Sequence, residues 1–180
     1  AGILIRNNEA AETAIRLDSI IFDKTGTLTT GEFSVTGVLP LDGLADDELL
    51  RLTAAVEAGS EHAIARGIAR VAEERRLHIE VTTDFRALPG RGAQAQVAGA
   101  MIAAGNRRLM DELGVETTPL QEQADRLAGE GNTLIYVARN SRLAGLIALA
   151  DTVRSESRDA VRELMAMDLE VVMLTGDHEN

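Results

Sequence analysis

The feature that most constrains this chain is a short apolar run that ends directly in a carboxylate and a glycine-containing loop. Residues 19–22 read Ser-Ile-Ile-Phe, as a buried strand does, and residues 23–29 read Asp-Lys-Thr-Gly-Thr-Leu-Thr. A carboxylate is a competent nucleophile for covalent catalysis. The sequence therefore predicts that Asp23 accepts a phosphoryl group at the end of a strand.

The residue types around Asp23 suit phosphoryl transfer. The transferred group needs cationic and hydrogen-bonding partners for its equatorial oxygens, and Lys24, Thr25 and Thr27 can supply them. Gly26 lets the backbone adopt a positive φ and approach the phosphate closely, so that successive N–H groups form an anion-binding nest. A simple turn after a strand is the alternative interpretation of this loop.

The two ends of the chain predict a strand, a crossover and a second strand. Residues 9–16 indicate a short helix before the first strand. Residues 152–167 repeat apolar side chains at helical spacing, and residues 169–174 predict a buried strand. The carboxyl ends of parallel strands meet at one crevice in a doubly wound fold. We therefore expect Thr175, Gly176 and Asp177 to lie close to Asp23.

The segment between has a different pattern. Helices are predicted at 46–58, 63–76 and 120–128, and the first two form a hairpin broken at Gly59-Ser60. Short strands are predicted at 81–88, 93–97, 100–104, 133–139 and 143–150. An antiparallel sheet with helices on it explains this order. We expect three segments: 1–31 and 150–180 as two parts of one domain, and 32–149 as an α+β insert.

A second set of polar residues and glycines lies in the insert. Ser60 is placed as the N-cap of the second helix, and Glu57 precedes His62 by five residues, so both side chains could face one pocket. Further along come Gly90 and Gly92 between two strands, and Asn106 where a strand meets a helix. Taken one at a time, these residues are as typical of turns, caps and solvated surfaces as of a site.

The run of residues 23–29 resembles the phosphorylation signature of P-type ATPases, which are ion pumps that pass through an aspartyl-phosphate. The order of Glu57, His62, Gly90, Gly92 and Asn106 after it resembles the nucleotide-binding domain of the heavy-metal branch of that family, where such residues surround the adenosine. This resemblance covers essentially the whole chain. It implies a partial haloacid-dehalogenase-like, Rossmann-type phosphorylation domain with an inserted nucleotide-binding domain.

The resemblance also implies roles for further residues. Thr175 would be a phosphate ligand, Asp177 would lie towards the nucleotide ribose, and Asp151 with Arg154 would help to hold the phosphate end of ATP. Mg²⁺ would be bound by one carboxylate oxygen of Asp23 and the backbone carbonyl of Thr25, since hard oxygen ligands suit this ion. For Asp151 a plain helix N-cap is an equally good interpretation.

Two positions depart from related patterns. Soluble hydrolases of the dehalogenase class carry a second aspartate two residues after the nucleophile, and this chain has Thr25 there. Without that general base the acyl-phosphate should hydrolyse slowly, which suits a pump better than a phosphatase. The heavy-metal branch has Pro after the His, and this chain has Ala63, which the first turn of a helix also accepts.

Composition excludes several other classes. The net charge is −11 and no run of Lys or Arg forms a polyanion groove, so nucleic acid is not an expected partner. Cysteine is absent, which excludes disulfides and thiolate metal sites. No apolar stretch approaches the roughly 20 residues of a membrane span. The chain opens without Met, as a piece of a longer protein would.

The sequence therefore predicts the catalytic fragment of an ATP-driven heavy-metal pump. Copper is the expected ion, and zinc, cadmium and cobalt are the alternatives. Its other expected partners are ATP and the actuator and membrane domains of the parent, at the cytoplasmic face of a membrane. The expected family pattern continues past Asn180 with a lysine and a second magnesium-binding aspartate, so we expect the isolated chain not to turn over ATP. A soluble phosphatase and a non-catalytic nucleotide-binding module are the alternatives.

Overall fold

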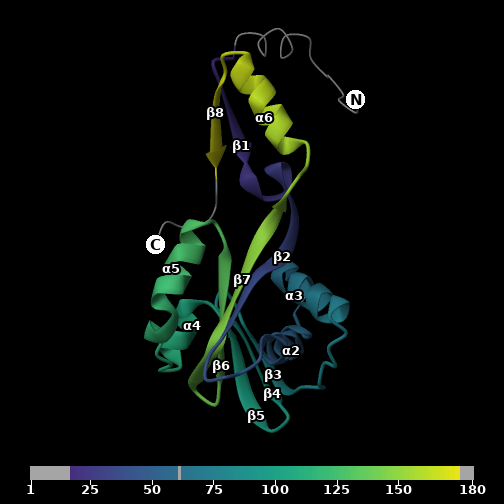
Figure 1. The fold of residues 1–180 in the computed structure, drawn as a ribbon, viewed down its shortest axis with the longest axis vertical. Helices are drawn as coiled ribbons and strands as arrows, with labels where there is room; N and C mark the ends of the chain where they lie inside the picture. Colours follow the sequence, from purple (N-terminus) through teal and green to yellow (C-terminus); the bar gives the residue numbers. More distant parts are fainter. Residues whose placement is uncertain (1–16, 61, 175–180) are drawn as a thin grey trace. The chain divides into compact units, whose positions relative to one another are not determined.

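The computed structural model describes residues 17–60 and 62–174. The helix expected at 9–16 and the expected phosphate-site residues Thr175, Gly176 and Asp177 lie outside these residues. The chain divides into two compact units (Figure 1). One combines the residues up to Gly31 with those from Val153 onward, and the other is Glu32–Thr152.

The first unit contains the parallel strand pair that the sequence predicts. Strand β1 (Ser19–Asp23) pairs in parallel with β8 (Glu170–Leu174), so that Ser19 faces Glu170 and Asp23 faces Leu174. Helix α6 (Ser157–Ala166) precedes β8. A single helical turn, η1 (Lys24–Leu28), follows β1 directly. The predicted α/β arrangement of this unit is therefore confirmed.

Two expectations for this unit were wrong. The helix predicted from residue 152 begins at Ser157, because strand β7 (Arg142–Val153) continues through the β-branched Thr152 and Val153. Asp151 consequently lies in a strand and is not a helix N-cap. Strand β8 is not buried: the side chains of Val172, Met173 and Leu174 are 38%, 54% and 63% exposed.

The second unit is built on one six-stranded sheet with the strand order β2-β7-β6-β5-β4-β3. The pairs from β3 to β7 are all antiparallel. Besides β7, the strands are β2 (Thr29–Pro40), β3 (Thr83–Leu88), β4 (Gly92–Val97), β5 (Ala100–Gly105) and β6 (Thr133–Arg139). The predicted α+β insert with an antiparallel sheet is confirmed.

Helices cover both faces of this sheet (Figure 1). Helices α2 (Asp46–Glu57) and α3 (Ala63–Glu74) share a core with one face, and α4 (Arg107–Glu112), η2 (Thr118–Leu120) and α5 (Gln121–Gly129) share a core with the other. The first core includes the fully buried Leu49, Leu50 and Ile68, and the second includes Leu109 and Leu146. Among the described residues, no helix combines the length and apolar character that crossing a bilayer requires.

The sequence gives correct positions for most of these elements but omits β2. Strand β2 is rich in β-branched Thr and Val, which favour strands, yet it also contains Gly31 and Gly37, which look like turn residues. The hairpin break predicted at Gly59-Ser60 is present between α2 and α3. That break positions the site described next.

Candidate functional site

The loop after β1 places Asp23 at the end of a strand, as the sequence predicts. Asp23 is exposed and has extended backbone angles, and the turn η1 begins at the next residue. Gly26 has φ +80° with nothing within 4 Å of a Cβ built on it, so the expected positive φ is present. Lys24 is half-buried and Thr27 is exposed. The side chain of Thr25 lies outside the described part of the structure.

Thr29 and Arg154 both make hydrogen bonds to the backbone of this loop. The Thr29 hydroxyl donates to the Lys24 carbonyl (2.9 Å) and accepts from the Gly26 amide (3.1 Å). The Arg154 guanidinium donates to the carbonyls of Gly26 (3.3 Å) and Thr29 (3.1 Å). Arg154 thus contacts the backbone of the loop that carries Asp23.

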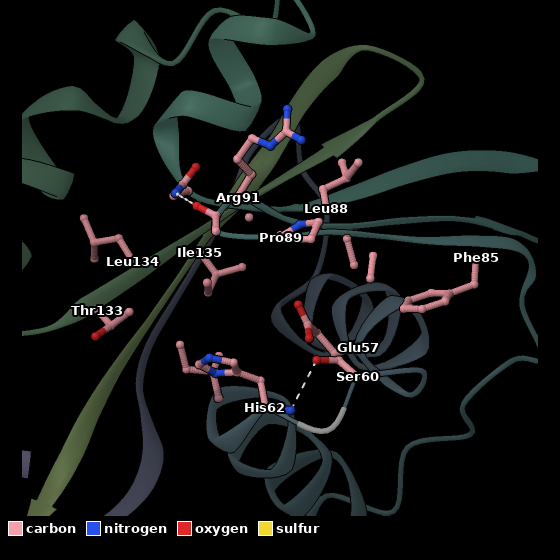
Figure 2. Close-up of a pocket in the computed structure, with 17 residues that line it drawn as sticks. Glu57, Ser60, His62, Phe85, Leu88, Pro89, Arg91, Thr133, Leu134 and Ile135 are labelled. Carbon is pink, nitrogen blue, oxygen red and sulfur yellow. Dashed lines mark hydrogen bonds between the residues drawn. The ribbon is translucent and has the colours of Figure 1, made fainter.

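A pocket of about 420 Å³ lies in the second unit, between the α2–α3 break and the β3–β4 turn (Figure 2). Its volume and its mostly apolar lining are those of a small-molecule site. All five residues predicted to surround a nucleotide line it: Glu57, His62, Gly90, Gly92 and Asn106. The sequence could not show that residues 57–62 and 90–106 meet, because their meeting depends on how α2 and α3 pack on the sheet.

Glu57 is the buried polar group of the pocket. It ends α2 and is 8% exposed. Burial raises the pKa of the Glu57 carboxyl above its ordinary value, and a hydrogen bond with Ser60 and the nearby His62 act in the opposite direction. The carboxyl can therefore donate or accept a hydrogen bond inside the pocket, depending on its protonation.

His62 lies where α3 begins, and this position corrects the prediction for Ser60. The N-cap residue of α3 is His62, and the helix starts at Ala63. Ser60 does not cap it; its hydroxyl accepts a 3.4 Å hydrogen bond from the His62 amide, drawn in Figure 2. The Ser60 side chain stays at the pocket wall and belongs to the site.

The two glycines of the β3–β4 turn have different roles. A Cβ on Gly92 would lie 2.1 Å from the Ala104 carbonyl oxygen and 2.5 Å from the Gly105 Cα, whereas a Cβ on Gly90 would meet nothing within 4 Å. Gly92 therefore lacks a side chain so that β4 and β5 can pair closely. Gly92 still lines the pocket, as Gly90 does.

Asn106 joins the turn to the next helix. Its Oδ1 accepts from the Leu109 amide (3.1 Å) as the N-cap of α4, and its Nδ2 donates to the Gly90 carbonyl (3.0 Å). One Nδ2 hydrogen remains after these bonds. Asn106 therefore shapes the pocket rim through the backbone and has one donor left for a ligand.

Other lining residues were not singled out from the sequence. Phe85 lies on the pocket wall, and its ring is 3.0 Å from the position of a Cβ on Gly59. Phe85 is an aromatic side chain of the pocket in a chain with only 2% aromatic residues. Leu88, Pro89 and Ile135 also line the pocket. Their apolar character is that of ordinary strand residues and gives no sequence signal.

An acidic metal cluster is not present in the described residues: no group of three or more His, Cys, Asp or Glu side chains is arranged to hold a cation there. Asp23 stands at the loop, while Asp151 lies in β7 and Arg154 follows it. An ion bound by one carboxylate and completed by phosphate oxygens and water is the arrangement that Mg²⁺ commonly takes. The donor set at Asp23 fits that arrangement.

Comparison with protein families matches residues 17–180 to the haloacid dehalogenase-like hydrolase model. The silver exporting P-type ATPase of Salmonella typhimurium is 40% identical over 99% of this chain, and so is the copper-exporting P-type ATPase B of Archaeoglobus fulgidus. The chain spans only 22% and 25% of the length of these two curated relatives.

Solved structures give the same result. A zinc-transporting PIB-type ATPase in its E2.Pi state is 37% identical, with a TM-score of 0.81 over 97% of this chain and 28% of that one. The N-domain of a copper-transporting P-type ATPase is 28% identical, with a TM-score of 0.57 over 65% of this chain and 99% of that one. The predicted similarity to the heavy-metal branch is confirmed.

Proposed function

This chain belongs to the haloacid dehalogenase-like hydrolase family, and from that premise we propose that it is the ATP-binding and phosphate-accepting part of a heavy-metal pump. The observation that carries the proposal is the pocket. Five residues whose order resembles that of the family's nucleotide site line one cavity: Glu57, His62, Gly90, Gly92 and Asn106. The size and apolar character of this cavity suit a nucleotide base and sugar.

In the proposed reaction Asp23 is the nucleophile. One carboxylate oxygen forms a bond to the γ-phosphorus of ATP, the bond from that phosphorus to the β–γ bridging oxygen breaks, and ADP leaves with the electron pair. Lys24 and Thr27 follow Asp23 in the turn and are the proposed partners of the phosphoryl oxygens. Mg²⁺, when bound at Asp23 and the Thr25 carbonyl, would supply charge neutralisation.

The same proposal extends to Thr175, Gly176 and Asp177, which lie outside the described residues, and to Asp151. Thr175, Gly176 and Asp177 follow β8, whose last residue Leu174 pairs with Asp23, and this register supports their proposed place near the acceptor. Asp151 lies in β7, and its contribution to holding phosphate stays a prediction. The unit Glu32–Thr152, which contains the pocket, would serve as the nucleotide-binding domain.

Copper is the proposed transported ion. The relatives named for copper support it, and the relative named for silver is as similar. Both metals form soft monovalent cations that prefer the same sulfur ligands. The test is ATP hydrolysis by the full-length protein with Cu⁺, Ag⁺ or Zn²⁺. We expect stimulation by Cu⁺ and Ag⁺, and stimulation by Zn²⁺ alone would contradict the choice of ion.

The catalytic assignment is tested with Asp23→Asn in the full-length protein. Wild type should form an acid-stable, hydroxylamine-sensitive phosphoenzyme from γ-labelled ATP, and Asp23→Asn should form none while binding ATP as before. Label on the Asn variant would place the nucleophile elsewhere. A wild type that binds ATP but takes up no label would favour the nucleotide-binding module, and fast release of phosphate without accumulated label would favour the phosphatase.

The pocket assignment is tested by calorimetric titration of ATP. His62→Ala should weaken ATP binding on the order of tenfold, which corresponds to about 1.4 kcal/mol. His78→Ala is the matched control, because His78 does not line the pocket. Unchanged ATP affinity in the His62 variant would remove that residue from the site.

A further inference from the structure

The loop that carries Asp23 is held by the segment that follows β7. The Arg154 amide donates to the Leu28 carbonyl (3.0 Å), and its guanidinium donates to the carbonyls of Gly26 and Thr29. The Ser157 hydroxyl donates to the Leu28 carbonyl as well (2.8 Å). Three carbonyls of one short loop therefore accept hydrogen bonds from residues more than 120 positions away in the sequence.

Two of the side chains at these contacts are buried. Thr29 is 4% exposed and Ser157 is 7% exposed, and they are the buried polar side chains among the described residues 17–31 and 153–174. Arg154 is half-buried. Buried polar groups are retained in proteins when their hydrogen bonds are satisfied, as they are here. The contacts of Thr29 and Ser157 are thus part of the packing of the first unit.

The geometry also uses a property that only arginine has. Its planar guanidinium presents several N–H donors in a fixed fork, and here Nε and Nη2 donate to two different carbonyls on either side of Leu28. Lysine offers a single ammonium on a flexible stem and would not span the two oxygens with the same geometry.

We propose that Arg154 and Ser157 are positioning residues for the phosphorylation of Asp23. They fix the backbone of the turn Lys24–Leu28, and through it the direction from which the Asp23 carboxylate attacks phosphorus. This differs from the role that family resemblance implies for Arg154, which is contact with the phosphates of ATP. The inference rests on the proposed function, since it concerns the same acceptor aspartate.

Two phosphoryl donors separate the two roles of Arg154. With ATP, the carboxylate forms its bond to the γ-phosphorus and ADP leaves. With inorganic phosphate, the same carboxylate forms the same bond to phosphorus, and one phosphate oxygen leaves as water after taking up protons. A residue that contacts only ATP matters for the first reaction alone. A residue that holds the acceptor loop matters for both.

The experiment compares four variants in the full-length protein that contains this chain: Arg154→Ala, Arg154→Lys, Ser157→Ala and the control Arg162→Ala. Arg162 pairs with Asp159 on the exposed surface of α6 (3.0 Å) and does not contact the loop. Phosphoenzyme formation is followed with labelled ATP and, without nucleotide, with labelled inorganic phosphate. ATP affinity is measured by calorimetry on the same preparations.

We expect Arg154→Ala to lower the maximal rate of phosphorylation on the order of 10- to 100-fold with either donor, as a small displacement of a reacting group does. ATP affinity should stay within about twofold, because Arg154 in this proposal contacts the loop backbone and not ATP. Arg154→Lys should fall between Ala and wild type, Ser157→Ala should lose several-fold, and Arg162→Ala should match wild type. Ser157→Ala and Arg154→Lys keep the test decisive if Arg154→Ala does not fold.

Two results would overturn the inference. Loss of ATP affinity in the Arg154 variants with normal phosphorylation by inorganic phosphate would make Arg154 a nucleotide ligand. Normal phosphorylation by both donors would leave the contacts without a role in the reaction. Neither result touches the proposed function, which fails only if wild type and Arg162→Ala form no phosphoenzyme at all.

Discussion

At the scale of single residues, Glu57 shows how one buried carboxyl links stability to pH. Its raised pKa comes mainly from burial. Between the pKa of the unfolded chain and that of the native state, the native carboxyl therefore keeps a proton that the unfolded chain releases. The contribution of this group to stability is complete below its ordinary pKa of 4.5 and is lost as pH rises through the higher pKa of the folded state.

Glu57→Gln should therefore make the protein more stable than wild type at pH 7, with little difference near pH 4. The amide keeps the shape of the carboxyl and removes the cost of burying a charge. Urea unfolding at both pH values measures the difference. A variant that is less stable than wild type at pH 7 would mean that the ionised carboxylate is held by stronger partners than Ser60 and His62.

The two turn glycines should respond very differently to substitution. Gly92→Ala places a Cβ 2.1 Å from the Ala104 carbonyl oxygen, and we expect a loss of roughly 3 kcal/mol or more, because backbone must move. Gly90→Ala, at φ +71° in open space, should cost only about 1–2 kcal/mol from its left-handed conformation. Chemical unfolding of both variants checks this order, which equal losses would contradict.

At the scale of elements, the sequence predicts those whose pattern is local. Helices α2 and α3 match the predicted ranges within two residues because their apolar spacing is strong, and the parallel pair β1–β8 follows from two apolar runs. Strand β2 was not predicted and the start of α6 was predicted wrongly, because strand pairing between distant parts of the chain decides both.

The pocket residues were predicted from the resemblance of their order to the family pattern. The packing around Gly92, Asn106 and Arg154 was not predicted, because each of them packs against or bonds to a carbonyl from another segment.

Gly67 of α3 and Gly129 of α5 differ in how closely their helix backbone approaches a neighbouring element. A Cβ on Gly67 of α3 would lie 2.5 Å from the Phe33 carbonyl oxygen in β2, while a Cβ on Gly129 of α5 would meet nothing within 4 Å. Alanine is the better helix former by about 1 kcal/mol. We expect Gly129→Ala to stabilise the protein by up to that amount and Gly67→Ala to destabilise it by about 1–3 kcal/mol. Thermal unfolding measures both, and stabilisation by both substitutions would show that α3 can move away from β2.

At the scale of the whole molecule, the two units differ in how much apolar surface they bury. Every buried hydrophobic side chain among the described residues belongs to Glu32–Thr152, and the first unit exposes Ile21, Met165 and Leu174 by more than 60%. Burial of apolar surface is the main source of folding free energy. The two units of this chain should therefore differ in stability.

Hydrogen exchange of the 180-residue chain should show this difference. Amides of β1 and β8 should exchange through low-energy local opening, whereas those of β5, β6 and β7 should require opening close to global unfolding. Mass spectrometry of peptides from the two regions, read over minutes to hours, measures the protection. Equal protection in both units would mean that they unfold as one cooperative body.

The insert enters the sheet on β2 and leaves it on β7, which are neighbouring strands, and the hydroxyls of Ser34 and Thr152 lie 3.4 Å apart. Adjacent strands are about 4.8 Å apart. If Glu32–Thr152 were removed, a tight turn could therefore join Gly31 to Val153. A segment with such ends can be spliced into a host loop without forcing the host apart. The unit Glu32–Thr152, which contains the pocket, thus has the geometry of an insertion whose two ends lie next to each other.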